Sequence, residues 1–375
     1  MGNCTSVEAV LVRHRSWRKL ETETLTTSPE EDSHVGGGSS REFFKVEGWE
    51  NEESGVLRYQ TSTLGQAKKE SLRSKKPILC CEVVVSCGTR TPMCDVFRHP
   101  LIVEAAESMF ITLYVEEFSE CRRGSTSVRV LNGRGQDVVK QVSGDGLSLA
   151  SVTTLMIDAA ESYKKPIPVY LQLLQEEACG RTRMGRVSDR VDQQAVFGMK
   201  DDTRQAEADF AGLGGVLSTR TGYLGNQQVI RVTYDSTRLC FDDLVRFALQ
   251  RKFANTIFYK TADEKTGATV ELEEMDDQET QLVSLDRTPI KPHLDPKHFL
   301  RTTMLRFVPL TDLQATRANR LVSRGVFNEA MQLLSPRQGM ILMQSMQNAS
   351  QGKGQKNEFV DVPITKAWKQ LSSVS

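Results

Sequence analysis

The first six residues of this 375-residue chain carry a pattern for covalent lipid attachment. Once Met1 is removed, Gly2 becomes the amino-terminal residue, and the Asn-Cys-Thr-Ser run after it fits the pattern for N-myristoylation. Cys4 follows two residues later, where its thiol can accept a palmitoyl chain. The spacing therefore predicts dual acylation, at Gly2 and at Cys4.

A stable lipid anchor needs two signals, because a single myristoyl chain binds a membrane with a constant of only about 10⁴ M⁻¹. A palmitoyl group on Cys4 is one candidate for the second signal. A basic patch is the other, since each cation near an anionic leaflet contributes about 1 kcal/mol. Its residues are Arg13, Arg15, Arg18 and Lys19. We expect a lipid-anchored protein on the cytoplasmic face of a membrane.

Composition narrows the classes of partner. The 48 basic residues balance 48 acidic ones, so the chain lacks the excess of positive charge expected of a protein whose main partner is nucleic acid. No apolar run approaches the roughly 18 residues of a membrane-spanning helix. The eight cysteines should stay reduced, because N-myristoylated proteins are cytosolic. The expected partners are a membrane surface and a protein that the sequence does not identify.

Polar and acidic residues separate the anchor from the folded part of the chain. Residues 1–50 are rich in Ser, Thr, Gly and Glu and cannot bury enough apolar surface to offset their ordering entropy. We predict a disordered membrane tether over 1–50, folded domains over 51–185 and 190–347, and a flexible tail over 348–375.

Residues 63–164 predict an α/β domain. Thr63 is a helix cap, and the run 78–85 is short and β-branched, which indicates a buried parallel strand. The predicted elements are a helix over 64–73, a strand over 78–85, a helix over 93–109, a strand over 110–115, a hairpin of 127–131 with 137–140, and a helix over 147–164. This order is that of a thioredoxin-like α/β sandwich.

Residues 60–165 also resemble the thioredoxin-like proteins that carry a Cys-x-x-Cys motif after the first central strand. The resemblance lies in Leu64-Gly65-Gln66-Ala67-Lys68-Lys69, Lys76-Pro77-Ile78-Leu79, Cys87 and Phe97-Arg98-His99-Pro100-Leu101-Ile102-Val103. In that family the first cysteine is the nucleophile and the second resolves the mixed disulfide, so the resemblance implies a catalytic role for Cys87. Arg90 occupies the place of the second cysteine. The family's cis proline is replaced as well, by Thr126.

Cys87 has a chemical reason to be reactive but lacks an adjacent resolving thiol. The positive end of a helix and the neighbouring Arg90 both lower the pKa of a thiol. Cys94 is the local candidate for a partner, yet seven helical residues would separate the two Cα atoms by about 10 Å, beyond the roughly 4.4–6.8 Å of a disulfide. Pro92 allows Cys87 to lie in a loop before the helix. A functional thiol and a relic both remain open.

The second half of the chain predicts a two-layer α+β domain of the ferredoxin-like kind. The predicted elements are a strand over 193–199, a helix over 204–211, strands over 217–223 and 229–234, a helix over 241–252 and a strand from 256. These residues resemble peptide methionine sulfoxide reductase of the A type over about 190–310. The resemblance lies in Ala195-Val196-Phe197-Gly198-Met199, Leu213-Gly214-Gly215-Val216, Thr221-Gly222-Tyr223-Leu224-Gly225 and the strand over 229–235.

The resemblance fails at the position of the nucleophile. The family carries Gly-Cys-Phe-Trp directly after the Phe-Gly-Met strand, whereas Asp201 and Asp202 occupy that position here. A carboxylate is a poor nucleophile toward sulfur and cannot form the sulfenic acid of the catalytic cycle. Glu207 matches the family's proton-donating glutamate to within one residue, and we expect it to be a vestigial, solvated side chain. We therefore predict a pseudoenzyme.

The remaining thiols give no sign of a site. Cys80, Cys81, Cys121, Cys179 and Cys240 are expected to be small buried residues or incidental surface thiols. Their spacing does not match a zinc site, and we expect neither a metal nor another cofactor.

A helical extension follows the second domain. Residues 264–278 are acidic and predict irregular structure, and helices are predicted over 298–304, 312–323, 326–334 and 336–346. Met331, Met340, Met343 and Met346 recur along these helices. A methionine-rich face can be an adaptable binding surface, but we expect it to pack against the domain.

Two functional classes follow from these observations. The favoured one is a membrane-tethered, non-catalytic adaptor or sensor built from a degenerate thioredoxin-like domain and a pseudo methionine sulfoxide reductase domain. The alternative is an active thiol oxidoreductase, of the peptide-methionine (S)-S-oxide reductase or the thioredoxin kind, that uses Cys87, with Cys94 as its partner.

Overall fold

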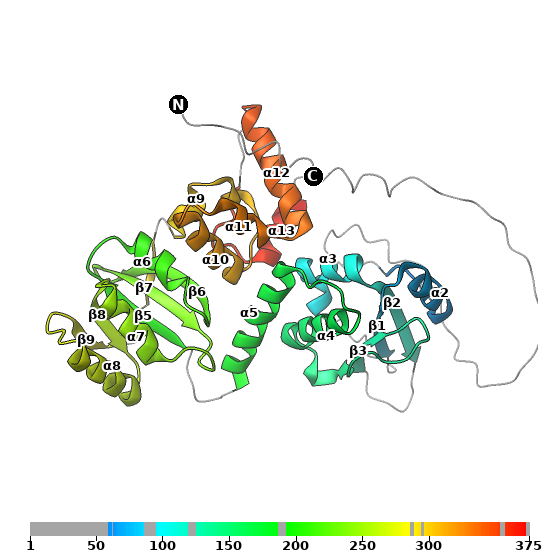
Figure 1. Ribbon diagram of the computed structural model, residues 1–375, viewed down its shortest axis with the longest axis horizontal. Helices are drawn as coiled ribbons and strands as arrows, with labels where there is room; N and C mark the ends of the chain where they lie inside the picture. The colour runs from blue at the N-terminus through cyan, green and yellow to red at the C-terminus, as the bar shows by residue number, and fades with distance from the viewer. Residues whose placement is uncertain are drawn as a thin grey trace, which may run out of the picture. The chain divides into compact units, whose positions relative to one another are not determined.

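The computed structural model describes residues 59–61, 63–85, 95–118, 125–186, 193–285, 289–293, 296–352 and 357–372. These residues form two lobes, each built on its own sheet, and a group of helices that follows the second sheet in the chain (Figure 1). The predicted tether over 1–50 lies outside the described residues.

The first lobe contains a four-stranded sheet in the order β2-β1-β3-β4. Its strands are β1 (Ile78–Val85), β2 (Ile111–Phe118), β3 (Ser125–Leu131) and β4 (Val142–Ser143). β1 pairs in parallel with β2 and antiparallel with β3. The side chains of β1 are mostly buried, as a strand covered on both faces requires. The predicted central strand over 78–85 is confirmed.

Helices cover this sheet. They are α2 (Leu64–Ser74), the 3₁₀ turn η2 (Asp95–Arg98), α3 (Pro100–Met109), the 3₁₀ turn η3 (Gly144–Gly146), α4 (Leu149–Ser162) and α5 (Val169–Arg186). Thr63 caps α2 by accepting a hydrogen bond from the Gln66 N–H at 3.3 Å. α3, α4 and α5 share one apolar core with β1 and β3, in which Phe97, Phe110 and Met156 are fully buried.

Three details of this lobe differ from the sequence-based prediction. The helix expected over 93–109 begins as α3 at Pro100, because a proline without an N–H suits the first helical turn but not the interior. The second strand of the hairpin is β4, not 137–140, and Asp137 makes only an isolated bridge with Leu131. The prediction also missed α5 entirely.

The second lobe contains a six-stranded sheet in the order β10-β6-β7-β5-β8-β9. Its strands are β5 (Gln194–Met199), β6 (Val216–Leu224), β7 (Gln227–Tyr234), β8 (Ala254–Tyr259), β9 (Gln281–Ser284) and β10 (Lys291–Pro292). The four central strands, β6, β7, β5 and β8, pair antiparallel with one another, and β9 joins the edge of β8 in parallel. Two helices, α6 (Thr203–Phe210) and α7 (Phe241–Gln250), connect β5 to β6 and β7 to β8. Both pack into one core, so two β-α-β units interleave under a single helical layer.

The acidic segment after β8 is a helix rather than irregular structure. It forms α8 (Ala262–Glu274), in which Thr261 and Glu264 make a reciprocal capping box. Only Ala268 and Glu271 of this helix are buried. Residues 262–274 have no apolar stripe, so their sequence shows no helical periodicity. The capping box is the local signal that indicates a helix here.

Six further elements follow the second sheet. They are α9 (His298–Arg301), the 3₁₀ turn η4 (Met304–Phe307), α10 (Asp312–Ser323), α11 (Phe327–Gln332), α12 (Pro336–Ser350) and α13 (Ile364–Ser372). Thr311 and Ser335 cap α10 and α12 through capping boxes. The tail over 348–375, which we expected to be flexible apart from a short element over 363–368 that could dock, contains α13, whose Ile364 and Trp368 pack into the first-lobe core.

α5 belongs to both lobes. Its first half contributes Tyr170, Leu171 and Leu174 to the first-lobe core. Further along, Gly180 lies so close to β6 that an added Cβ would be 2.6 Å from a methyl carbon of Leu217. α5 packs against α4 at one end and against β6 at the other, and it also contacts α10 of the helical extension.

We expect Phe210→Ala to lower the free energy of unfolding by about 3–5 kcal/mol, because it empties a fully buried site. The ring of Phe210 stacks on Phe197 with centroids 5.1 Å apart and meets Phe247 edge-on at 5.3 Å. Urea denaturation measures the change. The matched control is Phe327→Ala, since Phe327 is 50% exposed and its truncation should cost less than about 1 kcal/mol. Equal losses in the two variants would contradict the assignment of this core.

Candidate functional site

Most residues of the predicted site lie outside the part of the chain that the structure describes. The lipidation residues Gly2 and Cys4, the basic patch of Arg13, Arg15, Arg18 and Lys19, and the thiols Cys87 and Cys94 are all among them. Asp201, Asp202 and Glu207, which the expected reductase resemblance singles out, are among the described residues.

Asp201 and Asp202 are exposed residues in the turn between β5 and α6. Asp202 is the N-cap of α6, and its Oδ1 accepts a hydrogen bond from the Arg204 N–H at 2.9 Å. A carboxylate in this position satisfies a free amide and favours the positive end of the helix. The position where an attacking thiolate would lie therefore holds a solvated helix cap.

The strand before this turn is covered by a polar side chain. A Cβ on Gly198 would collide with the side-chain amide of Gln227, so only glycine fits beneath that side chain. The Gln227 Nε2 donates hydrogen bonds to Asn255 Oδ1 at 2.7 Å and to Thr256 Oγ1 at 2.8 Å. This hydrogen-bonded group fills the space beside the end of β5.

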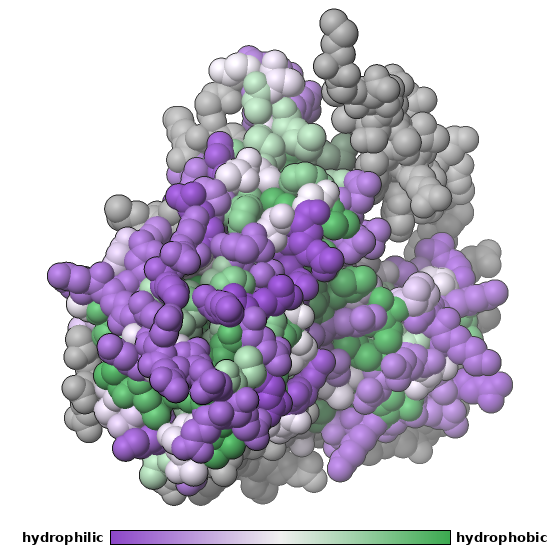
Figure 2. Space-filling model, turned by 60° about the vertical axis from the view of Figure 1, so that its left-hand side comes forward, coloured by the Kyte–Doolittle hydropathy of each residue, from purple (hydrophilic) through white to green (hydrophobic). Residues whose placement is uncertain are grey.

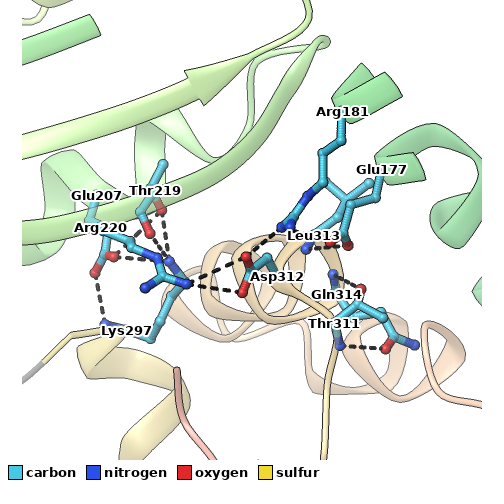
Figure 3. A network of polar contacts seen from close by, with 10 residues as sticks. All are labelled: Glu177, Arg181, Glu207, Thr219, Arg220, Lys297, Thr311, Asp312, Leu313 and Gln314. Carbon is cyan, nitrogen blue, oxygen red and sulfur yellow. Dashed lines mark hydrogen bonds and ion pairs between the residues drawn. The ribbon is translucent and has the colours of Figure 1, made fainter. Parts of the chain in front are cut away.

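Glu207 is fully buried, in contrast to the solvated glutamate we expected. Its two carboxylate oxygens are both held by Lys297 (Figure 3). The Lys297 backbone N–H donates at 3.0 Å, and the Lys297 Nζ lies 3.2 Å from the other oxygen. The same ammonium donates to the hydroxyl of Thr219 at 3.1 Å and to the Thr219 carbonyl. The carboxylate of Glu207 is thus engaged by an internal cation.

Burial of the Glu207–Lys297 ion pair costs free energy, and several hydrogen bonds hold the pair in place. Burial raises the pKa of Glu207, and the neighbouring ammonium of Lys297 opposes that rise. The Lys297 side chain is itself 2% exposed. Its backbone is left-handed, with φ of 54° and ψ of 48°, which costs a non-glycine residue about 1–3 kcal/mol. A buried ion pair needs such additional hydrogen bonds to offset the loss of hydration.

A second set of ion pairs lies beside the first and centres on Asp312, the first residue of α10 (Figure 3). Asp312 accepts from Arg181 of α5 at 2.5 Å and from Arg220 of β6 at 3.3 Å. Burial alone would raise the pKa of Asp312, but these two guanidinium groups lower it below its ordinary value. Asp312 therefore links the last helix of the first lobe to the second sheet.

Two arginines of α10 complete the attachment of that helix. The Arg317 Nη1 donates to the carbonyls of Ala211 and Leu213 at 2.6 and 3.2 Å, and the Arg320 Nη1 donates to the Asp209 carbonyl at 3.0 Å. These carbonyls lie at the carboxyl end of α6 and in the turn that follows it, and those of Asp209 and Leu213 also accept the backbone N–H groups of Gly212 and Val216. The side chain of Arg320 also covers Gly212, where a Cβ would collide with it. α10 thus acts as a cap on α6.

The described thiols are not arranged as nucleophiles. Cys80 and Cys81 are buried in β1, and burial raises the pKa of Cys80 to about 12. Cys240 is exposed and caps α7, where partial burial and a hydrogen bond to Asp243 at 2.9 Å raise its pKa. Cys179 is half-buried on α5, and Cys121 lies outside the described residues.

Two hollows of the described part of the chain are not lined by Asp201, Asp202 or Glu207. One is a cavity of about 10 Å³ lined by residues such as Leu310, Asp312 and Phe359, which is too small for a substrate. The other is an open groove of about 620 Å³ beside α2, with Lys69 and Lys76 on its wall. Among the described residues, no three His, Cys, Asp or Glu side chains are placed to hold a metal ion, and no helix is long and apolar enough to cross a bilayer.

A scan against models of known protein families and a search of the curated proteins both find no match for this chain. The chemistry of the site must therefore be judged from its geometry. In that geometry Asp202 caps α6 in solvent, Glu207 is paired with Lys297, and the side chain of Gln227 fills the space beside β5. None of these side chains can attack a sulfur atom.

The Lys297–Glu207 pair was missed by the sequence reasoning. Glu207 was singled out, but its partner lies 90 positions away, and nothing in the Asp-Pro-Lys-His segment marks the lysine as buried. A single sequence carries no signal for a contact of that separation.

We expect Lys297→Met to lower the free energy of unfolding by about 3–5 kcal/mol, because it leaves the Glu207 charge buried without its partner. Glu207→Gln combined with Lys297→Met should recover more than half of that loss. The matched control is Lys200→Met, which removes a pair with Glu279 on the exposed surface and should leave stability unchanged.

The pH dependence gives a second readout of the same variant. Because the folded-state pKa of Glu207 is raised, its contribution to stability is full below the ordinary pKa of 4.5 and is lost as pH rises through the raised value. Lys297→Met should therefore be less destabilised at pH 5 than at pH 8. A loss that is the same at both values would contradict a buried, ionisable Glu207.

Proposed function

We propose that this chain is a membrane-tethered, non-catalytic adaptor or sensor, built from a degenerate thioredoxin-like lobe and a pseudo methionine sulfoxide reductase lobe. The observation that carries the proposal is the state of Asp202 and Glu207. One caps α6 in solvent, and the other is sealed in an ion pair with Lys297. Neither is free to attack a substrate or to donate a proton to it.

The strand orders support the two finer fold assignments. A sheet ordered β2-β1-β3-β4, with a helix between the parallel strands β1 and β2, is the arrangement expected of a thioredoxin-like lobe. The interleaved β-α-β units of the second lobe give the order β6-β7-β5-β8, as in a ferredoxin-like sheet. Both agree with the families that the sequence resembles.

An exposed methionine face on α12 supports a role in protein binding. Met340, Met343 and Met346 are 62%, 47% and 45% exposed, whereas we had expected them to pack against the domain. In Figure 2 pale green side chains gather near the top of the view, the height at which Figure 1 draws α12, with white and purple side chains around them. Flexible thioether side chains can adapt to partners of different shape.

We expect the purified full chain to show no turnover of a peptide containing methionine sulfoxide in the presence of dithiothreitol. The physical reason is the absence of a thiolate at the amino end of α6, where Asp202 is a cap. Mass detection of the reduced peptide measures the reaction. A matched Cys87→Ser variant distinguishes the alternative, since turnover that this variant abolishes would mean that the first lobe carries an active thiol. Turnover that survives with every first-lobe thiol blocked would overturn the pseudoenzyme assignment.

The membrane tether is tested separately. In eukaryotic cells, Gly2→Ala should move the chain from the membrane fraction to the soluble fraction, because it removes the acceptor for myristate. Cys4→Ser should give partial release, because a single myristoyl chain binds a membrane with an association constant of only about 10⁴ M⁻¹. A chain that stays with membranes in the Gly2→Ala variant would exclude N-myristoylation as the anchor.

A further inference from the structure

Two carboxylates of the first lobe each bind the amino-terminal turn of a helix from the extension. Glu177 of α5 accepts a hydrogen bond from the backbone N–H of Leu313, in the first turn of α10, at 3.0 Å. Glu104 of α3 accepts one from the backbone N–H of Arg337, in the first turn of α12, at 2.7 Å. Both glutamates are buried, at 8% and 5% exposure.

An ion pair accompanies each of these contacts. Beside Glu177, Arg181 of α5 binds Asp312 at the start of α10. Beside Glu104, Glu107 of α3 binds the side chain of Arg337 at 2.6 Å. The two contacts thus share one design, in which a buried glutamate holds a helix amide and a residue one turn later pairs with that helix. We call them together the joint.

Protein side chains usually cap their own helix, and both helices already have such caps in Thr311 and Ser335. The carboxylates of the joint add a cap from another part of the fold. They lie at the positive end of each helix, where a negative charge is favourable. The contact also buries the carboxylate away from water, and burying a charge costs free energy. These opposing effects make the contact sensitive to the charge state of the two glutamates.

We propose that the joint is a proton-responsive device, in which mild acid tightens the contact of α3 and α5 with the first turns of α12 and α10, and alkaline pH loosens it. A carboxyl group that takes up a proton keeps an oxygen that accepts from the helix amide. It also loses the charge that burial penalises. In the contact of Glu104, Oε2 is a buried oxygen with no hydrogen-bond partner among the described residues, and it is the atom that can carry the proton.

The surroundings of both carboxyl groups agree with this direction. The groups that face Glu104 are Arg337 and Ser335 from the side of α12, Glu107 on its own helix and Tyr170 on α5. Those that face Glu177 are Arg181 on its own helix, with Asp312, Thr311 and the Leu313 amide from α10. Burial is the largest influence on each and raises the pKa of both glutamates, and the nearby arginines only oppose it.

The sign of the pH effect follows from linkage. A raised pKa in the closed joint means that the closed state binds protons more tightly than the open state. Closure is therefore favoured as pH falls through the raised pKa values, and the gain is complete below the ordinary value of 4.5. The open state gains as pH rises toward 8.

Amide hydrogen exchange on the full chain tests the device. Peptides that cover the first turns of α10 and α12 are followed between pH 5 and pH 8, and their rates are divided by the intrinsic rates of the same unstructured sequences at each pH, with a peptide from the central strand β7 as the folded reference. We expect protection of both turns to increase by about fivefold from pH 8 to pH 5. Protection that does not change, or that increases toward pH 8, would overturn the proposal even without a variant.

Two variants separate the charge from the contact. Glu104→Gln combined with Glu177→Gln keeps an accepting oxygen at each amide, so the turns should stay protected while the pH dependence disappears. Glu161→Gln, which changes an exposed glutamate on α4 of the same lobe, should keep the wild-type pH dependence. An unchanged pH slope in the double variant would assign the effect to other groups and refute the device.

Discussion

A carboxylate sealed away from water must be neutralised, and the second lobe is organised around that constraint at Glu207. Lys297 supplies both a backbone amide and an ammonium to it, in a left-handed conformation that lysine rarely adopts. The ammonium also binds Thr219 of β6. One side chain therefore ties the helix α6, the strand β6 and the start of the helical extension to a single point.

The extension is held to the sheet by charge as much as by apolar packing. α10 brings Asp312 between two arginines at its start, and its own Arg317 and Arg320 satisfy carbonyls at the end of α6. Removing α10 would take the arginine hydrogen bonds from those carbonyls and would separate Arg181 and Arg220 from Asp312. α10 is thus an integral part of the second lobe, although it follows the sheet in the chain by many residues.

Acidic side chains in this protein repeatedly hold helix amino ends. Asp202 does so for α6, and Glu177 and Glu104 do so for α10 and α12. The same interaction with a helix amino end that lowers the pKa of a catalytic thiol in a redox enzyme stabilises a carboxylate here. The proposed adaptor role and the proposed joint both rest on this use of charge for docking rather than for chemistry.

Local patterns in the sequence were enough to predict the strand over 78–85, the cap at Thr63 and the order of β5, α6, β6, β7, α7 and β8, because these depend on neighbours a few residues apart. Asp202 and Glu207 were singled out by the resemblance to the reductase family and not by a local pattern. Only the tertiary structure decided that Glu207 is buried, that Lys297 is its partner and that α5 joins the lobes. Those outcomes depend on contacts between residues as many as 90 positions apart, whose energy comes from burial and charge pairing that no local spacing records.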